Sequence, residues 1–190
     1  MNRQPQVTEQ TRAHLMQAFW ELYLEKPIDK ITIREITDRA GYNRATFYLH
    51  YRDVYDLFEQ LENGILTQIG KLVNDRLLTE ETLDFSNHMG FIVQLAERFN
   101  GFMPRLLASD PSFAARLKAI ITPLLDHFII PAGTLTPDEQ DILREFYATG
   151  LLSAITAWMS LRERMPIDQF VALIVRTLAP GADSGDAPAQ

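Results

Sequence analysis

The chain has 190 residues, enough for one domain of average size or for a small domain joined to a medium one. Apolar residues make up 46% and charged residues 23%, a balance that excludes a mainly disordered protein. The sequence contains no cysteine, so disulfides, thiolate nucleophiles and cysteine-ligated zinc are also excluded.

The net charge of −7 argues against a protein that coats nucleic acid indiscriminately. Residues 1–55 hold eight basic and seven acidic side chains, whereas the remaining residues hold ten and eighteen. Chance variation between two ordinary halves explains this split better than a division of function, so charge alone assigns no role.

The ends and apolar stretches of the sequence predict a cytoplasmic protein without a membrane partner. The first twelve residues are polar and lack the apolar core of a secretory signal. The longest uncharged stretch, 146–161, has sixteen residues and falls short of the roughly twenty that span a bilayer. We therefore expect it to form a buried helix.

Helical spacing of apolar residues recurs along the whole chain, and no alternating run ends in a hairpin turn, so the sequence predicts an all-α fold. The first helix is expected to begin after Thr8 as N-cap and to end before Pro27. Its buried positions repeat at the spacing of one helix face: Leu15, Ala18, Phe19 and Leu22.

Two short helices are predicted next, joined by a tight turn. Thr32 and Glu35 have the spacing of a capping box, and Gly41 suits the left-handed residue that ends a helix. Asn43 can cap the following helix, expected over 44–51. Within it Phe47 and Tyr51 share the inward face, which leaves an outward face that consists of Ala45 and Leu49, with Thr46 and Tyr48 at its flanks.

Further caps predict the remaining helices. Asp53 begins a long helix that reaches about residue 77, and Ser86 begins one that reaches about residue 99. Asp110-Pro111 and Thr136-Pro137 each place a cap before a proline at the first helical position. The first of these helices contains Pro123, which should kink it; the second is expected to reach about residue 164. A last helix is predicted from Pro166 to about residue 178, and residues 180–190 are predicted to be a disordered tail.

The paired short helices have the pattern of a helix-turn-helix, which presents its second helix to the major groove of DNA. Residues 11–58 resemble the N-terminal domain of the tetracycline-repressor (TetR) family of transcriptional regulators. The features that carry the resemblance are the Thr32-Ile33 start, the Ala40-Gly41 turn and the run Thr46-Phe47-Tyr48 with His50-Tyr51. Residues 146–178 look like the two C-terminal helices through which this family dimerises. The resemblance implies a helix-turn-helix domain over 1–52 and a helical regulatory and dimerisation domain over 53–179.

The resemblance also implies a set of DNA-binding positions on and around the second short helix. The planar guanidinium of Arg44 can bond guanine O6 and N7 together, and Ala45 and Leu49 can contact a thymine methyl. Thr32 lies at a helix start where a phosphate can dock. Any one of these side chains is equally consistent with an ordinary surface, but their order on one face favours DNA binding. The full predicted set is Thr32, Tyr42, Asn43, Arg44, Ala45, Thr46, Tyr48, Leu49, His50 and Arg52.

One position departs from the family pattern. Val54 stands where the family often has a phosphate-contacting lysine, and Arg52 is the candidate to replace it. The loss of one phosphate contact should weaken binding and lower the salt slope by about one unit without changing the preferred sequence.

The C-terminal helices carry the predicted dimer face. A twofold dimer is expected because the second short helix, the reading helix, makes few base contacts by itself, whereas two copies read a pseudo-palindrome. The alternative is that the same apolar residues of these helices pack in the core of the subunit. The predicted interface residues are Phe146, Tyr147, Gly150, Leu151, Ala154, Trp158, Phe170 and Ile174.

The central segment is expected to hold an effector pocket, because the resemblance implies one. Aromatic, methionine and histidine residues at helical spacing are its candidates, with ordinary core packing as the alternative. These candidates are His88, Phe91, Phe99, Phe102, Met103, Phe113 and His127.

The function predicted from these patterns is a homodimeric regulator, in the first place a repressor, that binds operator DNA and answers to a small-molecule or protein effector. The alternative is a helical regulator that acts through a protein partner and has a weakened DNA-binding domain. An enzyme is disfavoured, because the four histidines are scattered and no metal-binding or phosphate-binding motif occurs. No catalytic residue, cofactor or metal is expected.

Overall fold

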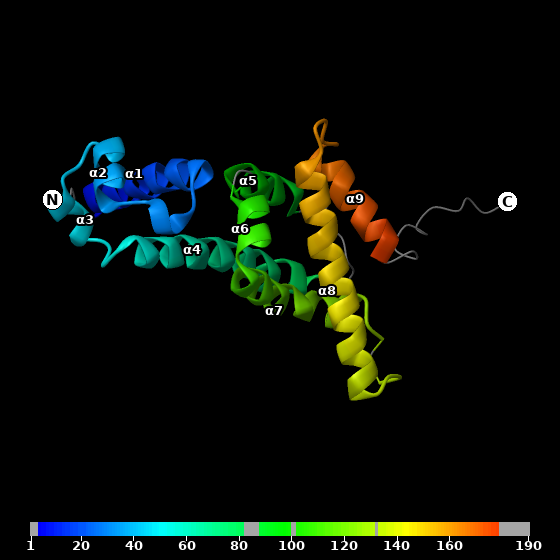
Figure 1. The fold of residues 1–190 in the computed structure, drawn as a ribbon. Helices are drawn as coiled ribbons and strands as arrows, with labels where there is room; N and C mark the ends of the chain where they lie inside the picture. Colours follow the sequence, from blue (N-terminus) through cyan, green and yellow to red (C-terminus); the bar gives the residue numbers. More distant parts are fainter. Residues whose placement is uncertain (1–3, 82–87, 100–101, 132, 179–190) are drawn as a thin grey trace. The chain divides into compact units, whose positions relative to one another are not determined.

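A computed structural model of the chain describes residues 4–81, 88–99, 102–131 and 133–178 (Figure 1). Within these ranges every regular element is a helix, so the all-α prediction is confirmed. The predicted cap Ser86 and the predicted disordered tail lie outside the described residues. The chain divides into two compact units, one ending at Gly64 and one beginning at Ile65.

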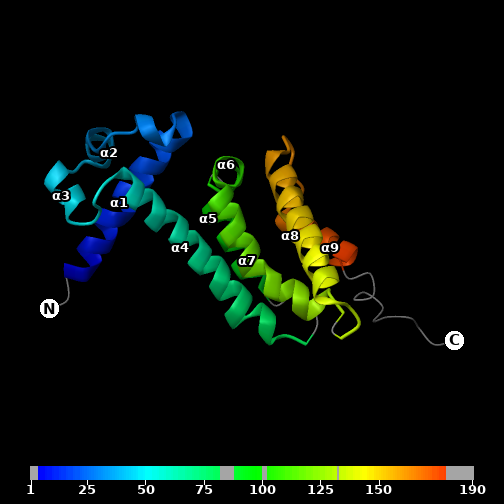
Figure 2. The same cartoon turned by 60° about the horizontal axis from the view of Figure 1, so that its bottom comes forward.

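The first unit contains α1 (Gln4–Glu25), the 3-10 turn η1 (Ile28–Lys30), α2 (Ile33–Ala40), α3 (Arg44–Tyr48) and the first part of α4 (Val54–Asp75). α1 packs against α2, and α2 packs against α3 (Figure 2). The side chains at its centre are fully buried: Leu15, Phe19, Ile36, Phe47 and Leu57. Burial of each stabilises the fold by roughly 1.5–3 kcal/mol relative to exposure.

Two boundaries of this unit differ from the prediction. α1 begins at Gln4 and runs through Thr8, because Pro5 falls in the first turn, where a missing N–H removes no helical hydrogen bond. The unit extends to Gly64 and not to residue 52, because the first turns of α4 belong to its core. The ring of Phe58 lies 5.9 Å from that of Phe19 and 5.2 Å from that of Tyr23.

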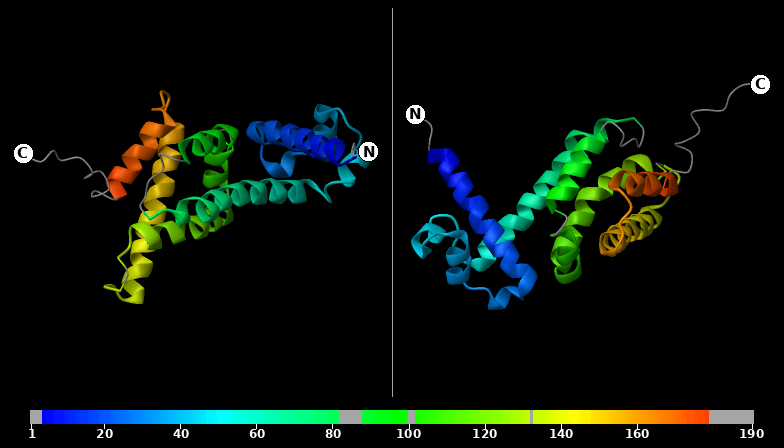
Figure 3. Two further views of the ribbon diagram at one scale, coloured as in Figure 1. Left: turned by 180° about the vertical axis from the view of Figure 1, so that it is seen from behind. Right: turned by 90° about the horizontal axis from the view of Figure 1, so that it is seen from above.

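The second unit contains the rest of α4, the 3-10 turn η2 (Leu77–Thr79), α5 (Met89–Phe99), α6 (Met103–Ser109), α7 (Pro111–Phe128), α8 (Pro137–Ser160) and α9 (Ile167–Leu178). α7 packs along α8, α6 contacts both, and α5 contacts α9 (Figure 3). Leu106 and Phe113 are fully buried here. α6 was not predicted as a separate helix; its proline, Pro104, lies near its start, where proline is tolerated.

The predicted caps of α7 and α8 are confirmed. Asp110 accepts a hydrogen bond from the Ser112 amide, and Thr136 forms a capping box with Glu139. α8 ends at Ser160, four residues before the predicted end. Pro166 disfavours helical geometry at Met165, and the Met165 carbonyl instead accepts a 2.9 Å hydrogen bond from the indole of Trp158.

The apolar stretch that begins at Phe146 lies almost wholly in α8, but one end of it is not buried: Phe146 is 68% exposed. Among the described residues, no helix combines the length and the hydropathy that a membrane span requires.

Candidate nucleic-acid interface

The start of α2 is held by hydrogen bonds between residues three apart. The Thr32 side chain accepts from the Glu35 amide, and the Glu35 carboxylate accepts from the Thr32 amide at 3.0 Å. Lys26 donates to the other oxygen of Glu35 at 2.5 Å. This ammonium and the Thr32 donors lower the pKa of Glu35 from 4.5 to about 2, so the carboxylate is ionised whenever the domain is folded near neutral pH.

The turn between α2 and α3 is set by two residues. Gly41 has φ +75°, a left-handed conformation that costs glycine little, and its amide bonds to the Thr37 carbonyl. Asn43 then caps α3: its side-chain oxygen accepts from the Thr46 amide at 2.8 Å and from the Thr46 hydroxyl at 3.1 Å. The predicted helix-turn-helix is therefore formed by the predicted caps.

Packing of Phe47 fixes which side of α3 faces outward. Phe47 is fully buried, with its ring 5.5 Å from that of Tyr51. The opposite side is open: Leu49 is 81% exposed and Tyr48 58%. Arg44 and Ala45 are also exposed, whereas Thr46 and His50 are half-buried. α3 is shorter than predicted, but the amides of His50 and Tyr51 still bond to the Phe47 carbonyl, which continues the turn.

We define the reading surface as Arg44, Ala45, Tyr48 and Leu49. Among the described basic side chains of the first unit, Arg44 is the one that has neither an ion pair nor a side-chain hydrogen bond. A free guanidinium keeps its donor fork available for a ligand, and breaks no internal contact when it binds.

Five of the other six cations of this unit are engaged by carboxylates. Arg39 bonds to Glu25 at 2.9 Å, which raises the pKa of Arg39 and lowers that of Glu25. Arg52 is exposed but contacts Asp56 at 3.3 Å. Residues 4–64 contain seven basic and ten acidic side chains, so the field around this unit gives phosphates little general attraction.

Besides Thr46 and Arg52, three more predicted DNA-binding positions have internal partners. The Thr32 hydroxyl donates to Glu35 at 2.8 Å, so this hydroxyl already has a partner within the chain. The Tyr42 hydroxyl lies 3.0 Å from Nδ1 of His14 in α1, with the two rings stacked. Asn43 uses its side-chain oxygen as the α3 cap. Val54, the departure from the family pattern, is 8% exposed and part of the core.

The predicted dimer residues fall into two groups. Phe146 and Gly150 are exposed on α8, and Tyr147 and Ala154 are half-buried. Trp158 and Phe170 instead stack on each other inside the unit, with ring centroids 4.8 Å apart. Leu151 and Ile174 line an apolar cavity of the same unit. Sequence reasoning missed Ile142 and Leu161, which are 68% and 47% exposed; Ile142 lies one helical turn before Phe146.

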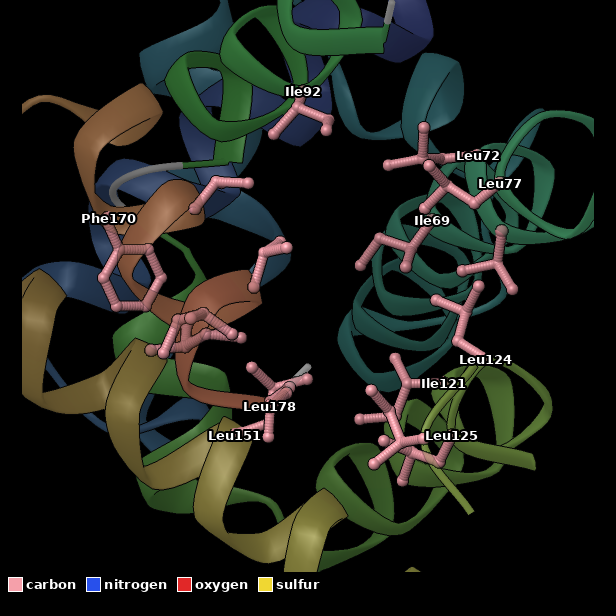
Figure 4. Close-up of a pocket in the computed structure, with 16 residues that line it drawn as sticks. Ile69, Leu72, Leu77, Ile92, Ile121, Leu124, Leu125, Leu151, Phe170 and Leu178 are labelled. Carbon is pink, nitrogen blue, oxygen red and sulfur yellow. The ribbon is translucent and has the colours of Figure 1, made fainter. Parts of the chain in front are cut away.

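The second unit contains an apolar cavity of about 220 Å³, lined by side chains from α4, η2, α5, α7, α8 and α9 (Figure 4). An adjoining cavity of about 200 Å³ shares with it the side chains of Ile69, Ile92, Ile155, Phe170 and Val171. The aliphatic lining carries no motif, which is why sequence reasoning did not find it.

Of the predicted pocket residues whose side chains the structure describes, Phe99 and Met103 line the second cavity and the others line neither. Phe113 is fully buried in the core, and Phe102 lies edge-on to Phe99. His88 lies 2.9 Å from the Glu80 carboxylate, and Nε2 of His127 lies 3.4 Å from the Glu80 carbonyl oxygen. The Phe91 side chain lies outside the described residues.

An exposed second helix in a helix-turn-helix, followed by a separate helical unit that contains an apolar cavity, defines a helix-turn-helix protein with a second helical domain. Residues 15–61 match the family model described as bacterial regulatory proteins, tetR family. The N-terminal domain belongs to this family, and the whole chain has the fold of TetR-family transcriptional regulators.

Solved structures agree with this fold. A TetR transcriptional regulator from Streptococcus agalactiae 2603V is 20% identical, with 92% of this chain and 97% of that chain covered and a TM-score of 0.65. A tetR-family transcriptional regulator from Streptomyces coelicolor is 18% identical, covers 90% and 80%, and has a TM-score of 0.59. The fatty acid degradation regulator FadR from Bacillus halodurans is 14% identical, covers 91% and 96%, and has a TM-score of 0.57.

Proposed function

We propose that the chain is a dimeric repressor that binds a pseudo-palindromic operator through the reading surface and responds to an effector held in its second unit. The observation that carries this proposal is the exposed, unpaired Arg44 beside Tyr48 and Leu49, on a helix fixed by the fully buried Phe47. A major groove accepts such a helix, and a free arginine there can bond the two acceptors of one guanine.

The dimer is proposed to form through the outer side of α8. Ile142, Phe146 and Leu161 are large apolar side chains that stay exposed in the single chain, and the exposed Gly150 leaves room for a close approach of a second helix. A twofold axis at this face would give each operator two reading helices. Thr32 is not part of the proposed DNA contacts, because Glu35 holds its hydroxyl.

The effector response is proposed to pass along α4. The cavity wall includes Ile69, Leu72 and Val73 of this helix, and the same helix begins at Val54 in the first unit. An effector that binds best to one of two positions of α4 would favour that position. It would thereby change the spacing of the two reading helices of the dimer and the affinity for the operator.

The test is a titration of DNA from upstream of the protein's own gene, with wild type and the Arg44→Ala and Leu49→Ala variants. Arg44→Ala should cost about 1–3 kcal/mol of binding free energy per bidentate contact. Leu24→Ala is the matched control for Leu49→Ala, because Leu24 is an exposed leucine of the same unit, at 48%, outside the reading surface. Equal binding of upstream and random duplex by wild type contradicts the proposal.

A second function has one observation in its favour. The excess of acidic side chains in residues 4–64 and the carboxylate partners of most cations favour a regulator that acts through a protein partner. This alternative predicts a shallow salt dependence of DNA binding and a stoichiometric protein complex, neither of which is altered by Arg44→Ala.

A further inference from the structure

The two adjoining cavities of the second unit differ from an ordinary binding site in one respect. Every one of the sixteen described side chains that line the larger cavity is Ile, Leu, Val or Phe. The smaller cavity adds Met103, Trp158 and Met159, and the Trp158 N–H is already bonded to the Met165 carbonyl. Among the lining residues that the structure describes, the walls therefore offer an occupant no charged group and no free side-chain hydrogen-bond donor.

Two polar side chains near the wall in sequence, Glu80 and His127, are bonded elsewhere. Glu80 follows the lining residue Leu77 by three positions, and His127 follows Leu124 by three. Nε2 of His88 lies 2.9 Å from the Glu80 carboxylate, and Nε2 of His127 lies near the Glu80 carbonyl oxygen. A buried polar group that gains no hydrogen bond is unfavourable, so a charged or strongly polar moiety has no place in these cavities.

The size and form of the space narrow the class of occupant. A dry apolar cavity of roughly 150 Å³ accepts benzene, and each of these cavities is larger, at about 220 and 200 Å³. The two share five lining side chains and so lie next to one another, and an occupant that spans both has to pass between these side chains. An elongated, flexible hydrocarbon fits two adjacent lobes better than one compact ring does.

We infer that the effector is an uncharged molecule whose buried part is an alkyl chain lying through both cavities. This inference rests on the proposed function only in that it calls the ligand an effector. Binding of the ligand to the two cavities does not depend on DNA. Val171 lines both cavities and therefore lies where such a chain passes from one to the other.

The experiment uses the full chain without DNA and the neutral fluorescent probe N-phenyl-1-naphthylamine, displaced by 1-decanol, decanoate or decyltrimethylammonium below their micelle concentrations. The three competitors share one chain length and differ in the charge at its end. We expect 1-decanol to displace the probe at least tenfold more effectively than either ion. Equal displacement by all three, or none by 1-decanol, overturns the inference.

Two variants place the site. Val171→Phe fills the junction and should weaken 1-decanol binding at least tenfold, whereas Leu173→Phe adds a phenyl on the same helix at a residue that is 39% exposed and lines neither cavity. Val171→Thr keeps the shape and replaces one methyl group with a hydroxyl, so it should weaken binding severalfold even if Val171→Phe does not fold. Wild-type affinity in Val171→Thr and in any folded Val171→Phe contradicts the assignment.

Operator binding is then measured separately with and without 1-decanol. If the alcohol occupies the cavity but leaves operator affinity unchanged, the ligand site stands and the proposed effector response fails. If the alcohol does not bind at all, the inference fails whatever the DNA measurement gives.

Discussion

Replacement of Asn43 by alanine removes the side-chain cap of the reading helix. The Asn43 oxygen accepts from the Thr46 amide at 2.8 Å and from the Thr46 hydroxyl at 3.1 Å, and α3 has five residues. A helix this short does not persist by itself, so its geometry depends on this cap and on the packing of Phe47.

The size of the effect follows from exposure. Asn43 is exposed, so water can replace the lost bonds, and the free energy of unfolding should fall by about 1 kcal/mol, not by the larger amount of a buried loss. If the same 1 kcal/mol is needed to hold α3 in the orientation that binds DNA, operator affinity should fall about fivefold per subunit. Serine caps as well as asparagine, so Asn43→Ser should keep both quantities near wild type.

The assay is urea denaturation of wild type, Asn43→Ala and Asn43→Ser, followed by operator titration of each. A loss of affinity in both variants, with stability lost only in Asn43→Ala, would mean that Asn43 itself contacts DNA. An Asn43→Ala protein as stable as wild type would refute the reasoning about the cap.

Three further predictions concern other parts of the chain. Glu35→Gln should lower the free energy of unfolding near neutral pH. Because folding lowers the pKa of Glu35 from 4.5 to about 2, the difference in unfolding free energy from wild type is complete above pH 4.5 and shrinks as the pH falls toward 2. Urea denaturation across this pH range measures the difference, and a constant value would contradict the prediction. Gly41→Ala should lose about 1–3 kcal/mol of unfolding free energy through its φ of +75°, although its Cβ would meet no atom within 4 Å, whereas the helical control Gly64→Ala should gain about 0.5–1 kcal/mol; equal effects would count against the strain argument. Phe146→Ser should shift the chain toward monomer in sedimentation velocity with unchanged helical circular dichroism, and an unaltered dimer would place the interface elsewhere.

The helix-turn-helix could be predicted because its determinants are local. The Thr32–Glu35 capping box, the left-handed Gly41 and the Asn43 cap all act within three or four residues, so their spacing in the sequence is nearly their geometry in space. The outward face of α3 followed from helical periodicity once Phe47 was placed inside. The same capping box engages the Thr32 hydroxyl, so the residue spacing that predicts the helix start also predicts an internal partner for this hydroxyl.

The cavity could not be predicted in the same way. Its lining comes from helices far apart in the sequence, and aliphatic side chains carry no mark that separates a wall from a core. Aromatic, methionine and histidine residues were the expected signals, and of these Phe99 and Met103 line the second cavity. The predicted dimer residues of the C-terminal helices also divide between an outer face and the core. The contact of Trp158 with Phe170 places these two side chains in the core, and it could not be predicted because it depends on how the chain turns back after Ser160.

Protection of guanine N7 from dimethyl sulfate, on DNA from upstream of the protein's own gene, tests the role of α3 most directly, because it reads contacts in the major groove base by base. The account predicts two protected half-sites related by a twofold axis, about 34–36 Å or a multiple of that distance apart, and loss of one guanine protection per half-site in Arg44→Ala. Protection that is absent in wild type, or identical in wild type and Arg44→Ala, would contradict it.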